Sequence, residues 1–153
     1  MLGHRQTYKQ PRDLPIYRAT MQIMSTIDDI HDDFQRDRRH TLWQQLCNES
    51  GKLPYLVCVA NDFPKHREEA LMIMLGIVSV MQSKLELCKT RGYISDKSYL
   101  AFAKPFSSIE RQANGWLNQT RQARVGNGSA ESAESYKGDS ILTTQLFGEL
   151  RTS

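Results

Sequence analysis

Residues 64–91 read PKHREEALMIMLGIVSVMQSKLELCKTR and form the most apolar stretch of the chain. Apolar side chains recur in it at alternating steps of three and four residues, the spacing that lines one side of a helix. They are Leu71, Met74, Val78, Met81, Leu85 and Cys88. A helix with one apolar side is stable when that side packs against other helices. The stretch therefore predicts an all-α protein with a shared helical core.

Three further segments show the same periodicity, over residues 15–34, 41–62 and 95–124. Pro54 and Pro105 fall inside the second and third of these, and we expect a kink at Pro54. Four helices joined by short connections predict an antiparallel up-down four-helix bundle. The apolar seams of the three segments are Ile16, Thr20, Ile23, Ile27, Ile30 and Phe34; Leu42, Leu46, Leu53, Leu56 and Ala60; and Tyr99, Phe102, Phe106, Ile109, Ala113 and Trp116.

The two ends of the 153-residue chain differ from this central part. Residues 1–14 form a short basic leader, and residues 15–124 form the predicted bundle. Residues 125–153 begin with VGNGSAESAESYKGDS, a Gly/Ser-rich composition that predicts a flexible C-terminal tail. Apolar residues between positions 141 and 150 indicate a short segment of the tail that can dock on a partner.

The predicted helix at 64–91 carries a second apolar row, about 110° round from the first. A single bundle core does not need both rows. Either another helix of the same subunit covers the second row, or another copy of the chain does. The latter interpretation predicts a homo-oligomer whose interface contains Ile73, Ile77, Val80 and Leu87.

Three groups of cations stand out along the chain. The first is a row at intervals of seven residues on the exposed side of the predicted helix at 95–124, extended at the end of that helix. The second lies in the first connection, and the third opens the helix at 64–91, where cations oppose the helix dipole. In this order the groups are Lys97, Lys104, Arg111, Arg121 and Arg124; Arg36, Arg38 and Arg39; and Lys65 and Arg67.

These cations allow two interpretations. They can form a solvated surface that keeps the protein soluble. They can also bind the phosphate backbone of RNA or DNA without reading its sequence. Residues 1–125 contain 18 Lys/Arg against 13 Asp/Glu, a modest excess that decides nothing by itself. The grouping of the cations along the chain favours the second interpretation.

Four aspartates crowd the end of the first predicted helix, where acids are unfavourable for the dipole. They are Asp28, Asp29, Asp32 and Asp33. A solvated acidic face explains them, and so does a site for a metal ion or a cationic protein partner. The partner interpretation predicts that they bind a basic protein.

Features of catalysis are missing from the sequence. It contains no nucleophile elbow, zinc-protease motif or phosphate-binding glycine loop, and its four histidines are scattered. The three cysteines, Cys47, Cys58 and Cys88, lie in apolar segments without metal-ligand spacing, which indicates reduced thiols in the cytoplasm. We therefore expect no enzyme, no cofactor and no metal. No apolar run approaches the roughly 20 residues needed to span a bilayer, so we expect no membrane-spanning segment and no membrane partner.

Four stretches together resemble a family of small four-helix bundles: FQRDRRHTLWQQL at 34–46, KLPYLVCVAND at 52–62, RGYISDKSYL at 91–100 and SIERQANGWL at 108–117. The family includes the accessory variability determinant (Avd) proteins of diversity-generating retroelements and the proteins encoded by intervening sequences in bacterial 23S ribosomal RNA genes. The resemblance covers about residues 15–120. Gln35 stands where the pattern has a proline.

Resemblance to the accessory proteins implies a ring-shaped homopentamer with a basic surface. It also implies association with the retroelement's reverse transcriptase and its template RNA, in support of mutagenic complementary-DNA synthesis. The polymerase then does the chemistry, and the cations named above hold the nucleic acid. Resemblance to the intervening-sequence proteins leaves another possibility open, a plain oligomeric interaction bundle with no nucleic-acid role.

Overall fold

Four long helices make up most of the protein in a computed structural model that describes residues 9–126. They are α1 (Pro15–Asp29), α3 (Gln44–Asp62), α4 (Arg67–Thr90) and α6 (Ala103–Gly126). All the other elements in this range are short helical turns. The predicted all-α class is therefore confirmed for the described residues, whereas the predicted tail at 125–153 lies almost entirely outside them.

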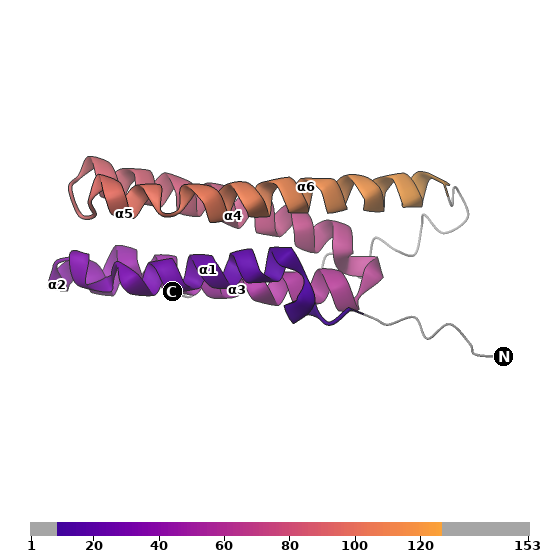
Figure 1. Cartoon of the computed structure of the whole chain (residues 1–153), viewed down its shortest axis with the longest axis horizontal. Helices are drawn as coiled ribbons and strands as arrows, with labels where there is room; N and C mark the ends of the chain where they lie inside the picture. Colours follow the sequence, from indigo (N-terminus) through magenta and orange to yellow (C-terminus); the bar gives the residue numbers. More distant parts are fainter. Residues whose placement is uncertain (1–8, 127–153) are drawn as a thin grey trace.

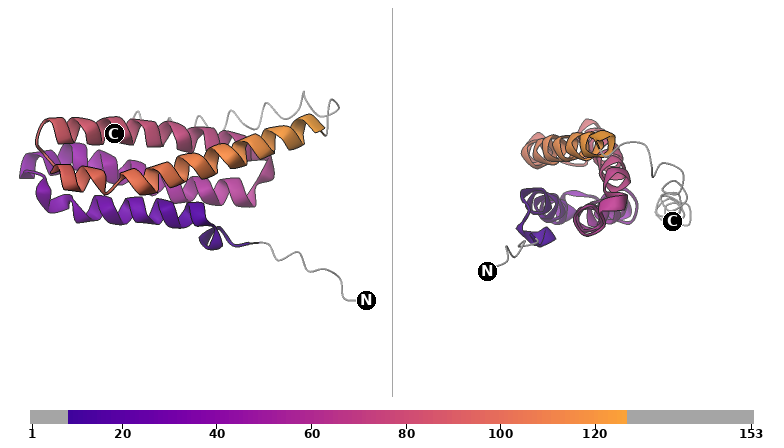
Figure 2. Two further views of the ribbon diagram at one scale, coloured as in Figure 1. Left: turned by 45° about the horizontal axis from the view of Figure 1, so that its top comes forward. Right: turned by 90° about the vertical axis from the view of Figure 1, so that its right-hand side faces the viewer.

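The four helices run side by side in two layers, with α1 and α3 in one and α4 and α6 in the other (Figure 1). Contacts join α3 to both α1 and α4, and α6 to both α4 and α1. Each helix thus touches two neighbours, and the view along the long axis shows the four arranged around a common centre (Figure 2).

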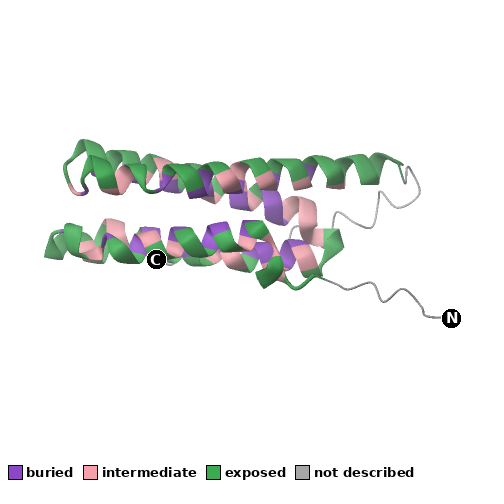
Figure 3. Ribbon diagram, viewed as in Figure 1, coloured by how far each residue is buried: buried purple, intermediate pink, exposed green. Residues whose placement is uncertain are grey.

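The apolar seams predicted from the sequence face that centre (Figure 3). Ile23, Leu53, Met74 and Ile109 are completely buried, one from each long helix. Thr20 is also completely buried, and its hydroxyl donates to the Tyr17 carbonyl oxygen at 2.6 Å, so no polar group there lacks a partner. The periodicity therefore predicted the inner faces of all four helices.

The connection between α1 and α3 is helical, which corrects two predicted boundaries. α1 ends at Asp29 and not at Phe34, and a 3-10 turn, η2 (His31–Asp33), follows it. A short helix, α2 (Arg36–Arg38), and a π-turn, η3 (Arg39–Trp43), then lead into α3, whose helical approach thus begins five residues before Thr41. The tighter η2 turn still lets Phe34 reach the core, where it is buried.

Trp43 fixes this connection to α1. Its indole Nε1 donates to the Ile27 carbonyl oxygen at 2.9 Å, and its ring meets the His31 ring edge-on at 4.6 Å between centroids. The bond satisfies one of the carbonyls that the end of α1 leaves without a helical partner. Trp43 therefore has a packing role.

Pro105 lies near the start of a helix, not inside one as predicted. The segment expected as one helix is α5 (Asp96–Leu100) followed by α6, with a turn at Ala101 and Phe102 between them. Pro105 consequently lies in the first turn of α6, where its missing N–H removes no helical hydrogen bond. Pro54, by contrast, lies inside α3, as expected.

The α4–α5 connection is a turn formed by Gly92 and Ser95. Gly92 has a φ of +73°, the left-handed conformation that glycine adopts without strain, and Tyr93 N–H donates to the Cys88 carbonyl oxygen at 2.8 Å. Ser95 caps α5, because its hydroxyl oxygen accepts from Ser98 N–H at 3.1 Å.

The stretch Pro64–Thr90, which joins η4 (Pro64–His66) to α4, is long and apolar enough to cross a membrane by length and composition alone. The sequence was expected to hold no such segment. One third of its most apolar window is buried inside the protein. The outer side of α4 accounts for much of the remaining apolar character, since Met72, Val80 and Leu87 are exposed there.

Candidate nucleic-acid interface

The exposed face of α6 carries the core of the predicted basic row. Lys104, Arg111 and Asn118 are all exposed, opposite the buried Ile109 and Ala113. Seven residues rise about 10.5 Å along a helix, which is about two turns, so Lys104 and Arg111 lie on the same face of α6. Lys97 is exposed too, but it lies on α5 beyond the Ala101–Phe102 turn. The structure therefore separates Lys97 from the continuous row.

Arg67 is the first residue of α4, but its guanidinium donates hydrogen bonds to the end of α3. Its Nε donates to the Ala60 carbonyl oxygen at 2.6 Å and its Nη2 to the Asn61 carbonyl oxygen at 3.4 Å, both in the last turn of α3. The guanidinium also lies over the Trp116 ring, 5.2 Å from its centroid. Burial lowers the pKa of the Arg67 guanidinium, which nevertheless stays charged at neutral pH.

These contacts explain why a cation stands at the start of a helix, where the dipole disfavours it. The positive charge meets the negative end of α3 and satisfies its terminal carbonyls. Arg67 was predicted to bind phosphate, and the structure places it in a structural contact. Lys65, in the η4 turn just before it, is exposed.

Arg121 and Arg124 share one carboxylate. Arg121 Nε lies 3.0 Å from Glu68 Oε1, and Arg124 Nη1 lies 2.8 Å from Glu68 Oε2. The side chain of Glu68 is 23% exposed, against 44% for Arg121 and 64% for Arg124. Both predicted cations therefore tie the end of α6 to the first turn of α4, and both remain open to solvent on their outer sides.

The predicted cations of the first connection have different surroundings. Arg36 is exposed, whereas Arg38 lies over the Tyr93 ring, 5.0 Å from its centroid. Arg39 Nε donates to the His31 carbonyl oxygen at 3.2 Å, and its Nη2 lies 3.8 Å from Asp32 Oδ1. The group thus forms part of the end of the molecule where α2 meets the α4–α5 turn.

The four predicted partner-binding aspartates are exposed at or near this same end. Asp32 Oδ1 lies 2.9 Å from His31 Nδ1, and Asp33 Oδ2 accepts from the Ser98 hydroxyl at 3.1 Å. Asp28 and Asp29 close the last turn of α1. Acidic and basic groups are therefore interleaved here, and in residues 9–126 no three carboxylate, imidazole or thiol groups converge as metal ligands.

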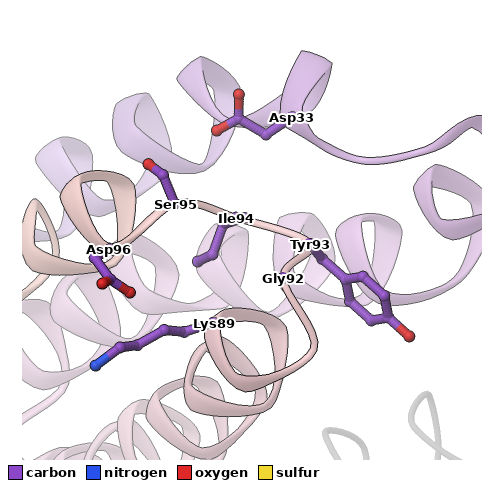
Figure 4. A pocket seen from close by; sticks show the side chains of 7 residues that line it. All are labelled: Asp33, Lys89, Gly92, Tyr93, Ile94, Ser95 and Asp96. Carbon is purple, nitrogen blue, oxygen red and sulfur yellow. The ribbon is translucent and has the colours of Figure 1, made fainter.

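The α4–α5 turn carries a further group of charged and aromatic side chains. The turn borders an open cavity of about 540 Å³, lined in part by Lys89, Tyr93, Asp33 and Asp96 (Figure 4). Lys89 Nζ lies 4.7 Å above the Tyr99 ring. No spacing in the sequence marks these side chains, because the pairs form only when α2 and α5 come together at one end.

The second apolar row of α4 divides into two parts. Ile73 and Ile77 are half-buried against the core of their own subunit, whereas Val80 is 48% exposed and Leu87 is 44% exposed. Met72, which the periodicity did not single out, is 51% exposed on the same helix. The outer face of α4 thus offers an apolar surface of Met72, Val80 and Leu87.

Two other groups of side chains, an ion pair and three cysteines, are buried or half-buried. Glu49 of α3 forms an ion pair with Lys84 of α4 in which the carboxylate side chain is 11% exposed and the ammonium side chain 25%. Burial raises the pKa of the thiols of Cys47, Cys58 and Cys88, and the carboxylates of Asp28 and Asp62 add to this for the first two. Raised pKa values make these thiols weak nucleophiles near neutral pH.

Comparison with known proteins found no relatives: no family model, no curated protein and no solved structure matches the chain. The fold and the surface just described therefore define its class by themselves. Over residues 9–126 it is all-α, with four long helices, exposed cations on α6 and at both ends of the bundle, and an apolar outer face on α4.

Proposed function

We propose that the protein is a non-catalytic, nucleic-acid-binding accessory subunit of a diversity-generating retroelement, an Avd protein. In this role it binds the reverse transcriptase and its template RNA, and supports mutagenic complementary-DNA synthesis. The exposed Lys104 and Arg111 on α6 carry the nucleic-acid part of the proposal. The sequence resemblance supplies the polymerase partner and the retroelement setting.

The helix order fits the bundle that this family uses. Consecutive long helices contact one another, and α6 returns to pack against α1. This neighbour order is the one that an up-down antiparallel bundle requires. The cations then lie on a rigid helical surface, which can hold a long RNA in register while the polymerase copies it.

Replacing Lys104 and Arg111 together by glutamate is expected to weaken binding to all RNA and DNA sequences alike. The wild-type affinity should fall with salt, by a slope of roughly −0.7 to −0.9 in log affinity against log salt for each neutralised phosphate. The double variant should lose about two such increments. Fluorescence anisotropy with labelled RNA over a salt series measures both quantities.

Arg12→Glu with Arg18→Glu is the matched control, because both arginines are exposed on the N-terminal side and the change in net charge is identical. This control should keep the wild-type salt slope. Binding that ignores salt, or a loss confined to one RNA sequence, contradicts backbone binding by the α6 row.

We also propose that the protein is a homo-oligomer, a pentamer by the family resemblance, assembled through the outer face of α4. Val80→Lys with Leu87→Lys is expected to dissociate it, since both side chains are exposed in the single subunit and can change without disturbing its core. Light scattering after size exclusion measures the mass. Met21→Lys on α1, 43% exposed, is the control that should leave the mass unchanged. A wild-type monomer at high concentration would contradict the assembly.

The polymerase contact is assigned to the aspartates at the end of α1. Changing all four to asparagine should abolish co-purification with the neighbouring reverse transcriptase, because a basic polymerase surface loses its counter-charge. The Lys104→Glu, Arg111→Glu variant should still co-purify. If both variants lose the polymerase, or neither does, the acidic end is not the docking surface.

A second candidate is a plain oligomeric interaction bundle with no nucleic-acid role. The charge of the described part favours it, because 17 Lys/Arg stand against 13 Asp/Glu and several of the cations are held in intramolecular contacts. A genome in which no reverse transcriptase is encoded near this chain would favour it further.

A further inference from the structure

Two tyrosines at the α4–α5 turn each carry a cation over one ring. Arg38 from α2 lies 5.0 Å from the Tyr93 centroid, and Lys89 from the last turn of α4 lies 4.7 Å from the Tyr99 centroid. Both rings are half-buried and pack against the core, so the fold holds them in place and leaves part of each accessible. Arg91, between Lys89 and Tyr93 in the sequence, is a further exposed cation.

Such pairs are the elements with which proteins hold unpaired nucleotides. A base stacks on an aromatic ring or on a guanidinium plane, while neighbouring ammonium and guanidinium groups bind the phosphates. In Figure 4 the Lys89 and Asp96 side chains extend to one side of the turn and the Tyr93 ring to the other. Lys89 and Tyr93, one member of each cation–tyrosine pair, therefore lie on opposite sides of the turn, and both line the cavity of about 540 Å³.

The carboxylates of Asp33 and Asp96 line the same cavity, and they favour single-stranded over duplex nucleic acid. A carboxylate repels a phosphate, but it accepts hydrogen bonds from the N–H groups on the edges of bases. In a duplex these edges are paired and the backbone faces outward. In an unpaired nucleotide the base edge is free to meet Asp96 while its phosphate meets Lys89.

We propose that the α4–α5 turn is a binding site for unpaired RNA nucleotides, formed by Tyr93 with Arg38 and by Tyr99 with Lys89. The site rests on the proposed function and specifies it: the α6 row binds any backbone, whereas the turn selects single-stranded segments. A structured RNA would then be oriented by placing a loop or a single-stranded junction at this end.

The test uses the full-length protein, an unstructured labelled RNA oligonucleotide, and the same strand annealed to its complement. Tyr93→Leu with Tyr99→Leu should weaken binding of the single strand about tenfold and leave duplex binding unchanged, because only the single strand can stack. The salt slope should not change, since the rings neutralise no phosphate. Tyr93→Phe with Tyr99→Phe should bind like the wild type.

Tyr55→Leu is the control for a tyrosine away from the turn, exposed on α3. Equal losses on single strand and duplex, or no loss on either, would overturn the site while leaving the proposed function intact. A wild-type protein that binds neither RNA would instead overturn the proposed function itself. Circular dichroism melting confirms that the leucine variants are folded.

Discussion

Lys84→Met is expected to lower the free energy of unfolding by about 3 kcal/mol. The substitution leaves the Glu49 carboxylate between α3 and α4 without its cation, and Glu49 is 8% exposed as a residue. Removing one partner of a buried ion pair costs about 3–5 kcal/mol, and the lower end applies because Lys84 is itself a quarter exposed. Chemical denaturation monitored by circular dichroism measures the change.

The double variant Glu49→Leu, Lys84→Met separates the cost of an orphaned charge from the value of the pair. It should recover the stability lost in Lys84→Met, because apolar side chains of similar size can replace a buried ion pair without loss. Glu86→Gln, exposed on the same helix, should change stability little. If Lys84→Met is as stable as the wild type, the carboxylate is not buried as described.

Arg67→Met is expected to cost about 2 kcal/mol of stability and to leave the salt dependence of RNA binding unchanged. The substitution removes the charged hydrogen bonds to Ala60 and Asn61 and the contact with the Trp116 ring. Denaturation and anisotropy on the same preparation separate the two effects. A lower salt slope without a loss of stability would restore Arg67 to the phosphate-binding group.

Lys65→Gln is the matched comparison, since Lys65 is exposed two residues away in the η4 turn. It should keep the stability of the wild type and, if phosphates reach this end, reduce the salt slope by less than one unit. A loss of stability in Arg67→Met and a lower salt slope in Lys65→Gln would show that the two neighbouring cations have different roles.

The inner faces of the helices were predictable because burial repeats with the helical period. Ile23, Leu53, Met74 and Ile109 are completely buried. Each has other apolar residues of its seam three or four positions away. Helix ends were less predictable. Phe34 continues the period of α1, yet it reaches the core across a 3-10 turn, and periodicity does not distinguish that path from a longer helix.

The surface was harder, because a cation's role depends on what lies opposite it. Arg67 meets carbonyls of the preceding helix, and Arg121 meets a carboxylate 53 residues earlier in the chain. Arg38 and Tyr93 come together only where α2 and the α4–α5 turn share an end. The spacing of residues along one segment does not reveal such pairs. The sequence therefore predicted one role, phosphate binding, for ten cations that have different partners in the structure.

Glu68 has one further consequence, for the way the end of α6 would respond to RNA. The two guanidiniums that hold its carboxylate at 3.0 and 2.8 Å are also the ones a phosphate would meet there. Binding at this end would be an exchange of one anion for another, and the released carboxylate would no longer tie α6 to α4. RNA binding at this end would then make the final turns of α6 less stable. Their amide hydrogens would exchange faster in the complex than in the free protein.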